Sequence, residues 1–380
     1  MKTSDLPASQ GPAEITVFHP DVFSVTDGPR SECIKSEWYD LLYPFLSLVS
    51  ARDKSIHAGR RREWTRCFTS KEKNLTIPPP LALTQHEDKI IKQIDELDQL
   101  IENNVLFNKH SEMRNLCFWF GFNAMRPLIP ASWLVQLGLR LGPRIWVIRD
   151  WHETTSPDLT HYLMEQEGEI SYKDSLYWMH GDSLLAIVAG SEPTAYIILA
   201  IFCELAKHPH HAENIYEELD GIDVTDLKKL NWASHLNAVI NETLRLYPAL
   251  LTSSARKTTK EGVMIGGVYI PPETTIVSPR FSIQRREDCF EQANSFIPER
   301  WTTRPEMIHN LAAFNPFSTG HHSCLGRQLA MDTMKLLMAR IVKKYRFRLA
   351  PGETGTRVFG EMVDQFTANP GNLSLVFEMR

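Results

Sequence analysis

The sequence lacks several features that would place it in a specialised class of protein. Its six cysteines lie far apart with no CxxC pair, which excludes a disulfide framework and indicates a reducing environment. The N-terminus, MKTSDLPASQ, has no charged-then-apolar signal pattern. No Gly-x-Gly-x-x-Gly follows a predicted strand, so a nicotinamide or flavin fingerprint is absent. Any electrons for redox chemistry must therefore come from outside the chain.

An excess of positive charge is also missing. The chain has 41 Lys and Arg against 46 Asp and Glu, giving a net charge of −5 and a pI near 6.3. This balance predicts no binding to nucleic acid. With 43% hydrophobic and 23% charged residues, the 380-residue chain has the composition of a soluble globular protein with a large core.

No uninterrupted hydrophobic run is long enough to indicate a membrane span. The most apolar window, LLAIVAGSEPTAYIILAIFC at 184–203, carries Ser191, Glu192, Pro193 and Thr194 at its middle. These residues favour a buried helix over a membrane helix.

The periodicity of apolar residues predicts a mostly helical chain. Helices are expected at about 86–102, 131–149, 173–207, 209–219 and 232–247, and from Cys324 to about 345. The segment 261–279 alternates β-branched residues with Gly and Pro, which predicts short strands and turns. The predicted fold class is mainly α with a small β portion (α+β). We expect one domain, 1–380, with residues 1–13 disordered.

One cysteine stands in an unusual context. In FSTGHHSCLG at 317–326, Cys324 lies where a predicted helix begins, and the partial positive charge there favours a thiolate. A thiolate is a metal ligand or a nucleophile. Gly320 can take turn geometry closed to other residues, Gly326 lets a flat group approach the helix, and Phe317 can cover the sulfur.

Two simpler interpretations of Cys324 are a buried packing residue and a zinc ligand. The first is the usual role of a lone cysteine. The second would use His321, His322 and Cys324, but three ligands within four residues give poor tetrahedral geometry.

A second motif lies before the cysteine. In ETLR, Glu242 and Arg245 stand three apart on one helical face, where an exposed ion pair would contribute roughly 0.2–0.5 kcal/mol. The turn FIPERW at 296–301 supplies another guanidinium, Arg300. A glutamate that accepts hydrogen bonds from both arginines would lock the loop that precedes Cys324.

A third motif interrupts the apolar helix. In AGSEPT, Pro193 has no N–H and clashes with the carbonyl of Ala189, a defect of about 3 kcal/mol if nothing compensates. Glu192 and Thr194 bring an acid and a hydroxyl to this turn. The alternative is a kinked core helix whose Glu192 reaches solvent.

Together, the pattern F-x-x-G-x-x-x-C-x-G, the ExxR helix and the PERW turn resemble the cytochrome P-450 family. The resemblance implies heme b (iron protoporphyrin IX) with Cys324 as its axial thiolate ligand. It places Phe317, Gly320, His322 and Gly326 in the haem-binding loop, and it makes a structural triad of Glu242, Arg245 and Arg300. His322 stands where the family commonly has Arg.

The resemblance also implies roles for more distant residues. AGSEPT is similar to the family's AGx(D/E)T(T/S) segment on the distal side of haem, which implies that Glu192 and Thr194 deliver protons. Pro193 departs from the pattern, since it stands where the first threonine usually does. His57, Arg61 and Arg256 match the family's cations for the haem propionates.

The activity implied by the resemblance is a monooxygenase that inserts one oxygen atom from O2 into an apolar small molecule, in fungal secondary metabolism. Its electrons would come from an NADPH-cytochrome reductase. One alternative is a haem-thiolate isomerase or dehydratase that needs no external electrons. Another is a catalytically defective haem-binding relative.

The resemblance runs from about Glu14 to Arg380 and is strongest to fungal microsomal members. The N-terminal membrane helix of those members has no counterpart, and the segment between about residues 100 and 133 is too short for the family's helices. We therefore expect an incomplete P-450 fold. The expected location is the endoplasmic reticulum surface, with peripheral membrane contact, or the cytoplasm.

Overall fold

The computed structural model describes residues 8–11, 13–43, 46–68, 91–92, 94–99, 101–103, 111–114, 117, 172–252 and 255–380. The helix predicted at 131–149 lies outside the described residues. The chain divides into two compact units. Unit 1 comprises Met1–Trp38, Glu96–Phe118 and Glu192–Arg380, and unit 2 comprises Tyr39–Asp95 and Trp119–Ser191. Each unit is described by itself.

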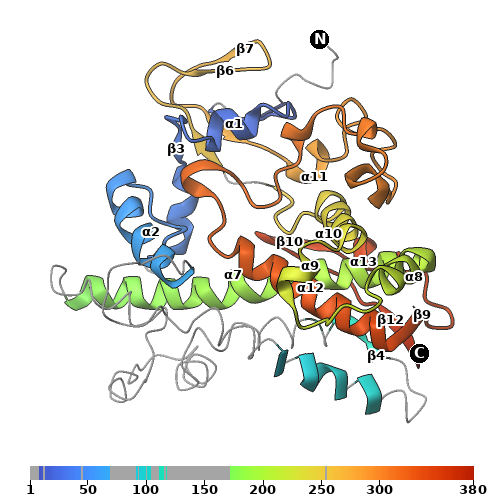
Figure 1. Ribbon diagram of the computed structural model, residues 1–380. Helices are drawn as coiled ribbons and strands as arrows, with labels where there is room; N and C mark the ends of the chain where they lie inside the picture. Colours follow the sequence, from blue (N-terminus) through green and yellow to red (C-terminus); the bar gives the residue numbers. More distant parts are fainter. Residues whose placement is uncertain are drawn as a thin grey trace. The chain divides into compact units, whose positions relative to one another are not determined.

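The long helices confirm the predicted helical segments to within a few residues. They are α7 (Tyr172–Lys207), α8 (Pro209–Glu218), α10 (Ser234–Leu246) and α12 (Arg327–Lys344), and α8, α10 and α12 lie together in Figure 1. Shorter helices are α1 (Val22–Asp27), α9 (Leu227–Leu230), α11 (Arg280–Ile283) and α13 (Arg357–Gly360).

The ends of these helices follow from local chemistry. Pro209 occupies the first turn of α8, where a missing N–H costs no hydrogen bond. The Asp226 carboxylate caps α9 by accepting from the Lys228 and Lys229 amides at 3.0 and 3.2 Å. Glu218 of α8 caps the neighbouring helix α10, accepting from the amides of His235 and Leu236 at 2.8 and 3.0 Å.

The β portion consists of short strands. A five-stranded sheet has the order β1 (Ala8–Gly11), β2 (Glu14–Thr16), β8 (Thr275–Val277), β5 (Arg256–Lys257) and β3 (Ile34–Lys35). Strands β2 and β8 are parallel, and the other pairs are antiparallel. The predicted strands within 261–279 are β8 and the hairpin of β6 (Val263–Ile265) and β7 (Val268–Ile270). These elements confirm the α+β class.

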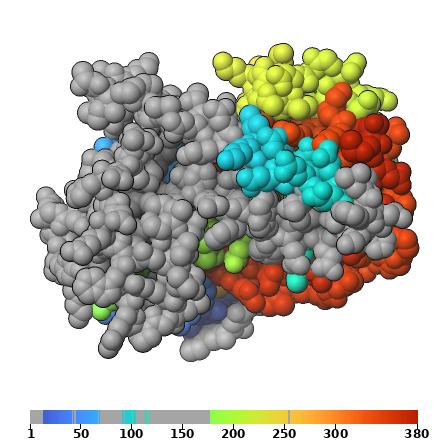
Figure 2. Space-filling model, turned by 90° about the horizontal axis from the view of Figure 1, so that it is seen from below, coloured from blue at the N-terminus to red at the C-terminus, as the bar shows by residue number. Residues whose placement is uncertain are grey.

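The C-terminal residues form two further small sheets. One contains β4 (Ser111–Glu112), β12 (Ser374–Met379) and β9 (Tyr345–Leu349), and the other contains β10 (Val363–Gln365) and β11 (Thr367–Asn369). Lys344 at the end of α12 pairs with Asp98 at 2.7 Å and Glu102 at 2.6 Å. Figure 2 accordingly shows the cyan segment around residues 96–117 beside the orange-red C-terminal segment.

Turns and short 3-10 helices fill the rest of the C-terminal half. These helices are η6 (Pro298–Trp301), η7 (Pro305–Met307), η8 (Leu311–Ala313) and η9 (Gly320–His322), and η2 (Glu37–Leu42) lies nearer the N-terminus. A segment with so few regular elements depends on side chains to satisfy its backbone groups. That requirement is met by the charged residues described below.

Helix α7 supplies much of the core of unit 1. By length and composition its stretch Tyr177–Lys207 could cross a membrane, and 56% of its most apolar window is buried. Phe202 is fully buried and packs edge-to-face on Phe347 and Phe377, with ring centroids 5.3 and 6.1 Å apart. These contacts are those of a core helix.

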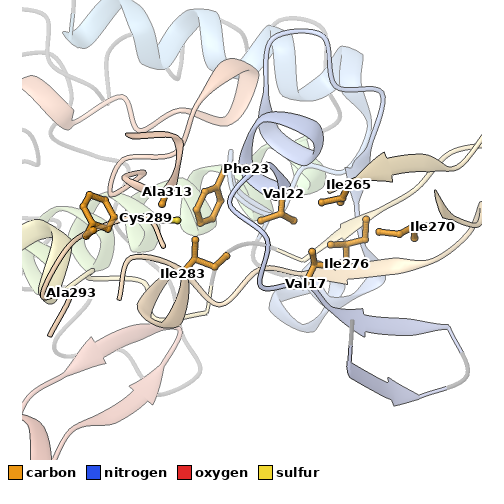
Figure 3. Close-up of a cluster of buried hydrophobic side chains, with 11 residues drawn as sticks. Val17, Val22, Phe23, Ile265, Ile270, Ile276, Ile283, Cys289, Ala293 and Ala313 are labelled. Carbon is orange, nitrogen blue, oxygen red and sulfur yellow. The ribbon is translucent and has the colours of Figure 1, made fainter. Parts of the chain in front are cut away.

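A second apolar cluster anchors α1. Val22 and Phe23 of this helix pack with Ile265, Ile270 and Ile276 of the strands, as Figure 3 shows. On the other side of α1 the cluster continues into the turn-rich segment through Ile283, Cys289, Phe290, Ala293 and Ala313. Helix α1 is therefore fixed against both the sheet and the segment that leads to Cys324.

The described part of unit 2 contains a buried ion pair. Arg60 of α2 (Lys54–Phe68) donates to Asp182 of α7, which is fully buried and also accepts from the Leu48 amide at 2.8 Å. Burial raises the pKa of Asp182, and the charge of Arg60 opposes that shift. Arg60 therefore joins the two helices.

Candidate cofactor site

Glu242 lies at the centre of a network of charged side chains with no solvent exposure. Arg245, one helical turn later on α10, donates from Nε and Nη2 to its two carboxylate oxygens at 2.9 and 2.7 Å. Arg300 of η6 donates from Nε to Oε1 at 3.0 Å, and Trp301 donates from Nε1 to Oε2 at 2.9 Å. We call these four residues the Glu242 network. The structure thus brings together Glu242, Arg245 and Arg300, and it adds Trp301.

The remaining donors of the two arginines hold the turn-rich segment. Arg245 donates to the carbonyls of Gln284, Ala293 and Ser295 at 2.9, 2.6 and 3.1 Å. Arg300 donates to the carbonyl of Glu291 at 2.9 Å. Since a guanidinium has five donors in a rigid fork, two arginines can fix many backbone groups at once.

Gln284 connects α10 to the loop of residues 315–326, which we call the Cys324 loop. Its side-chain amide donates to the carbonyls of Leu244 and Arg245 at 3.1 and 2.8 Å, and its Oε1 accepts from the amide of Asn315 at 3.0 Å. Gln284 is fully buried. Sequence reasoning did not identify it, because no local pattern marks a glutamine whose partners lie about 30 to 40 residues away.

The Cys324 loop has a tight backbone. The amide of Cys324 donates to the carbonyl of Phe317 at 2.8 Å, which closes the loop. Ser318 and Gly320 have φ angles of 57° and 63°. A Cβ on Gly320 would lie 2.2 Å from the carbonyl oxygen of Asp27, so only glycine fits. Helix α12 begins at Arg327, three residues later than predicted, because the Cys324 amide bonds back into the loop.

Cys324 is exposed, whereas Cys33, Cys117, Cys203 and Cys289 are all buried. This exposure contradicts the interpretation of Cys324 as a packing residue. The zinc interpretation gains no support, because the described residues contain no group of three or more His, Cys, Asp and Glu suited to a metal ion.

The surroundings of the thiol suit a flat apolar group. Leu329, Ala330 and Met331 on the first turns of α12 are half-buried, while Thr333 to Ala339 further along are buried. A Cβ added to Gly326 would lie 4.0 Å from the Cys324 sulfur, so glycine leaves this side of the sulfur open. An exposed thiol beside apolar side chains and a glycine is a donor set that fits a haem with one axial thiolate.

The three predicted propionate cations and His322 of the haem-binding loop lie in different elements. Arg256 of β5 is buried, with its Nη2 2.8 Å from Asp27 Oδ1. His322 is half-buried in η9, within the Cys324 loop. His57 is buried and Arg61 is half-buried on α2, which belongs to unit 2.

The predicted proton-delivering residues do not face one another. Helix α7 continues through Pro193. The half-buried Glu192 accepts a hydrogen bond from Thr367 of β11 at 2.6 Å, which is not the solvent-directed side chain of the kinked-helix alternative. Thr194 is buried, two residues further along the helix, where side chains at i and i+2 point apart. The structure therefore links Glu192 to β11 and not to Thr194.

Thr367 follows a strained residue. Phe366, between β10 and β11, has a φ of 75°, which a bulky side chain rarely adopts. Its ring stacks on Trp38 with centroids 5.2 Å apart, and both rings are partly exposed. The hairpin that fixes Glu192 thus also presents the ring of Phe366, which stacks on Trp38 of η2.

Comparison with known proteins agrees with this geometry. Residues 69–377 match the family model of cytochrome P450. The chain is 33% identical to "Cytochrome P450 monooxygenase orf5" of Eupenicillium brefeldianum, over 97% of this chain and 82% of that protein. It is 30% identical to "Cytochrome P450 monooxygenase FCK2" of Fusarium pseudograminearum, over 97% and 74%, and 29% identical to "Tryprostatin B 6-hydroxylase" of Aspergillus fumigatus, over 97% and 75%. Members of the matched family bind haem through a cysteine thiolate. The chain belongs to the cytochrome P450 family.

Proposed function

We propose that this protein is a haem-thiolate monooxygenase with Cys324 as the axial ligand of haem b. The observation that carries the proposal is the exposed thiol of Cys324 in a glycine-dependent loop, joined through Gln284 to the buried Glu242 network. A packing cysteine would need neither the exposure nor the fixed loop. The same arrangement gives a metal ligand a defined position.

The residues of unit 1 would hold the cofactor from the Cys324 side. Cys324 would supply the thiolate, while Phe317, Gly320 and Gly326 shape the loop around it. His322 and Arg256 would supply donors to the propionates. When bound, a thiolate-ligated haem supplies the chemistry that inserts one atom of O2 into a C–H bond and releases the other atom as water.

The reaction consumes two protons and two electrons for each molecule of O2. Glu192 of α7 would be the acid that passes protons, and its carboxylate is held in one orientation by the Thr367 hydroxyl at 2.6 Å. Thr194 would supply a hydroxyl to the same turn of α7. Pro193 has no N–H to donate to the Ala189 carbonyl, which leaves that oxygen available to a water molecule.

The electrons would come from NADPH through a separate reductase. The substrate would be an apolar small molecule of fungal secondary metabolism. This part of the proposal is supported by the names of relatives, one of which is a hydroxylase of tryprostatin B. Phe366 lies on the hairpin that also holds Glu192, and together with Trp38 of η2 it offers a stacked aromatic surface.

A second candidate function is a haem-thiolate isomerase or dehydratase that uses no external electrons. The proline at position 193, where relatives of the monooxygenase type usually have an alcohol, favours it. The two candidates differ in their need for NADPH and the reductase. Product formation that depends on both would support the monooxygenase, and conversion of an organic peroxide without either would support the second candidate.

The test of the proposal is the absorption spectrum of the haem-loaded protein, reduced and exposed to carbon monoxide. We expect a red-shifted Soret band typical of a thiolate ligand, lost in Cys324→Ala and kept in Cys289→Ala. Because Cys324 is exposed, its replacement should leave the unfolding temperature of the haem-free protein nearly unchanged. Wild-type protein that takes up no haem, or a Cys324→Ala variant that keeps the band, would contradict the proposal.

A further inference from the structure

Arg256 is held by a carboxylate of the protein itself. Its Nη2 lies 2.8 Å from Asp27 Oδ1, and the two side chains are 3% and 0% exposed. Among the charged pairs of unit 1, this one lies beside the Cys324 loop, because the carbonyl oxygen of Asp27 fills the space where Gly320 would carry a Cβ.

Both members of the pair are fixed in place. Asp27 ends α1, whose Val22 and Phe23 lie in the apolar cluster of Figure 3. The Thr26 hydroxyl donates to the Val22 carbonyl at 2.8 Å, which tightens the same turn. Arg256 lies in β5, paired with Ile276 of β8 on one side and Lys35 of β3 on the other. The backbones of both residues are therefore anchored, and the two can separate only by rotation of their side chains.

A buried guanidinium requires an anion near it, because an unpaired buried charge is strongly destabilising. Asp27 meets that requirement from within the chain. A haem propionate that approached Arg256 would therefore meet a guanidinium that is already neutralised, with a second carboxylate beside it. Two carboxylates close together in a buried site repel each other.

We propose that Asp27 competes with a haem propionate for Arg256 and so weakens the binding of haem. The inference rests on the proposed haem site at Cys324. It gives Asp27 a positioning role that the sequence did not indicate: it holds the arginine in place before the cofactor arrives, and it lowers the affinity for the cofactor in return.

The competition predicts opposite effects on the two forms of the protein. Replacing Asp27 by the isosteric, neutral Asn leaves Arg256 without its anion in the haem-free form, which should then be less stable. In the haem-loaded form the propionate takes the place of Asp27, so haem should be held more tightly. We expect haem loss to slow by on the order of tenfold, since removing one buried like charge at contact distance has at least this effect.

The experiment follows the transfer of haem from the loaded protein to excess apomyoglobin by absorbance. Asp27→Asn and Asp27→Ser should both lose haem more slowly than wild type, and Asp27→Glu, which keeps the charge, should not. The matched control is Asp288→Asn, whose partner Arg286 lies 2.5 Å away in a more exposed pair. The thermal unfolding midpoint of the haem-free forms provides the second readout.

The outcomes separate this inference from the proposed function. Wild-type protein that takes up no haem contradicts the proposed function. Wild-type protein with the thiolate band, together with neutral variants that lose haem at the wild-type rate or faster, overturns only the competition. If the neutral variants are too unstable without haem, they should accumulate as haem-loaded protein when haem is supplied during expression. Failure to accumulate even then also overturns the competition.

Discussion

The Glu242 network and the Cys324 loop lie in the same unit and are built in opposite ways. In the network, every charged group is buried and makes several hydrogen bonds, so that Glu242 alone accepts from Arg245, Arg300 and Trp301. In the loop, the key thiol is exposed, and the backbone passes through left-handed conformations at Ser318 and Gly320. The comparison indicates that the buried hydrogen bonds of the Glu242 network fix the backbone, and that the Cys324 loop depends on this fixed backbone to present an exposed thiol.

The link between the two regions is narrow. The Gln284 side chain is hydrogen-bonded to backbone carbonyls of α10 and to the backbone amide of Asn315 at the start of the loop. Gly320, in the middle of the loop, contacts the backbone of Asp27. A loop held at two such points can keep a reactive side chain exposed without a local core of its own.

The strongest test of this comparison is Arg245→Ala. The change leaves Glu242 buried with one arginine fewer and frees three backbone carbonyls, so we expect a loss of about 3–5 kcal/mol of stability and little folded haem protein. Chemical unfolding and the yield of haem-loaded protein measure it. Arg286→Ala, which breaks a more exposed pair with Asp288, is the control and should cost less than about 1 kcal/mol. A wild-type yield from Arg245→Ala would remove the distinction between the two regions.

A smaller loss is expected from Gly320→Ala, which tests the contact between the Cys324 loop and Asp27. The new Cβ would lie 2.2 Å from the Asp27 carbonyl in a backbone with a φ of 63°, so we expect a cost of about 3 kcal/mol. Gly352→Ala is the matched control, because its φ is 81° but nothing lies within 4 Å of the new Cβ. That variant should cost only about 1 kcal/mol. Equal unfolding midpoints in the two variants would show that the contact with Asp27 does not matter.

The smallest effect concerns pH near the Glu242 network. The His211 Nδ1 lies 3.2 Å from His235 Nε2 and 3.8 Å from Glu299 Oε1, the residue before Arg300. Burial, followed by the neighbouring His210, His235 and His208, lowers the pKa of His211 to about 3, and burial also lowers the pKa of His235.

Because the folded pKa lies below the unfolded value near 6.5, the unfolded state binds more protons in acid. The stability contributed by these histidines is present above about pH 6.5 and is lost as the pH falls toward 3. By pH 5 we expect a loss of about 2 kcal/mol for His211. Unfolding free energies between pH 7.5 and 5 should flatten in His211→Gln and not in His309→Gln, an exposed histidine. Parallel curves for all three proteins would rule out this linkage.

The sequence predicted the residues with local signatures and missed those defined by distant contacts. The spacing of Glu242 and Arg245 on one helical turn, and the turn with Arg300, could be recognised because each motif is contiguous. Gln284, Thr367 and Asp27 could not, because their importance comes from partners such as Asn315, Glu192 and Arg256 far along the chain. Fold class was accessible for the same reason, since helical periodicity is a local property.

The ion pair of Arg256 shows most clearly what the sequence could not predict. Its sequence context suggested an arginine available to a cofactor, and only the structure shows that Asp27 already holds it. The placement of Glu192 is similar, because a helix pattern gives the face of a residue but not the strand that meets it. Pairing between elements requires the three-dimensional arrangement.

Helix α10, which carries Glu242, does not supply its own N-terminal cap, since Glu218 of α8 accepts its first amide hydrogens. Because the capping residue belongs to α8, the first turn of α10 depends on the last turn of α8. We therefore expect the two helices to open together in local unfolding, and the amide hydrogens at the start of α10 to exchange with solvent faster when the end of α8 is released.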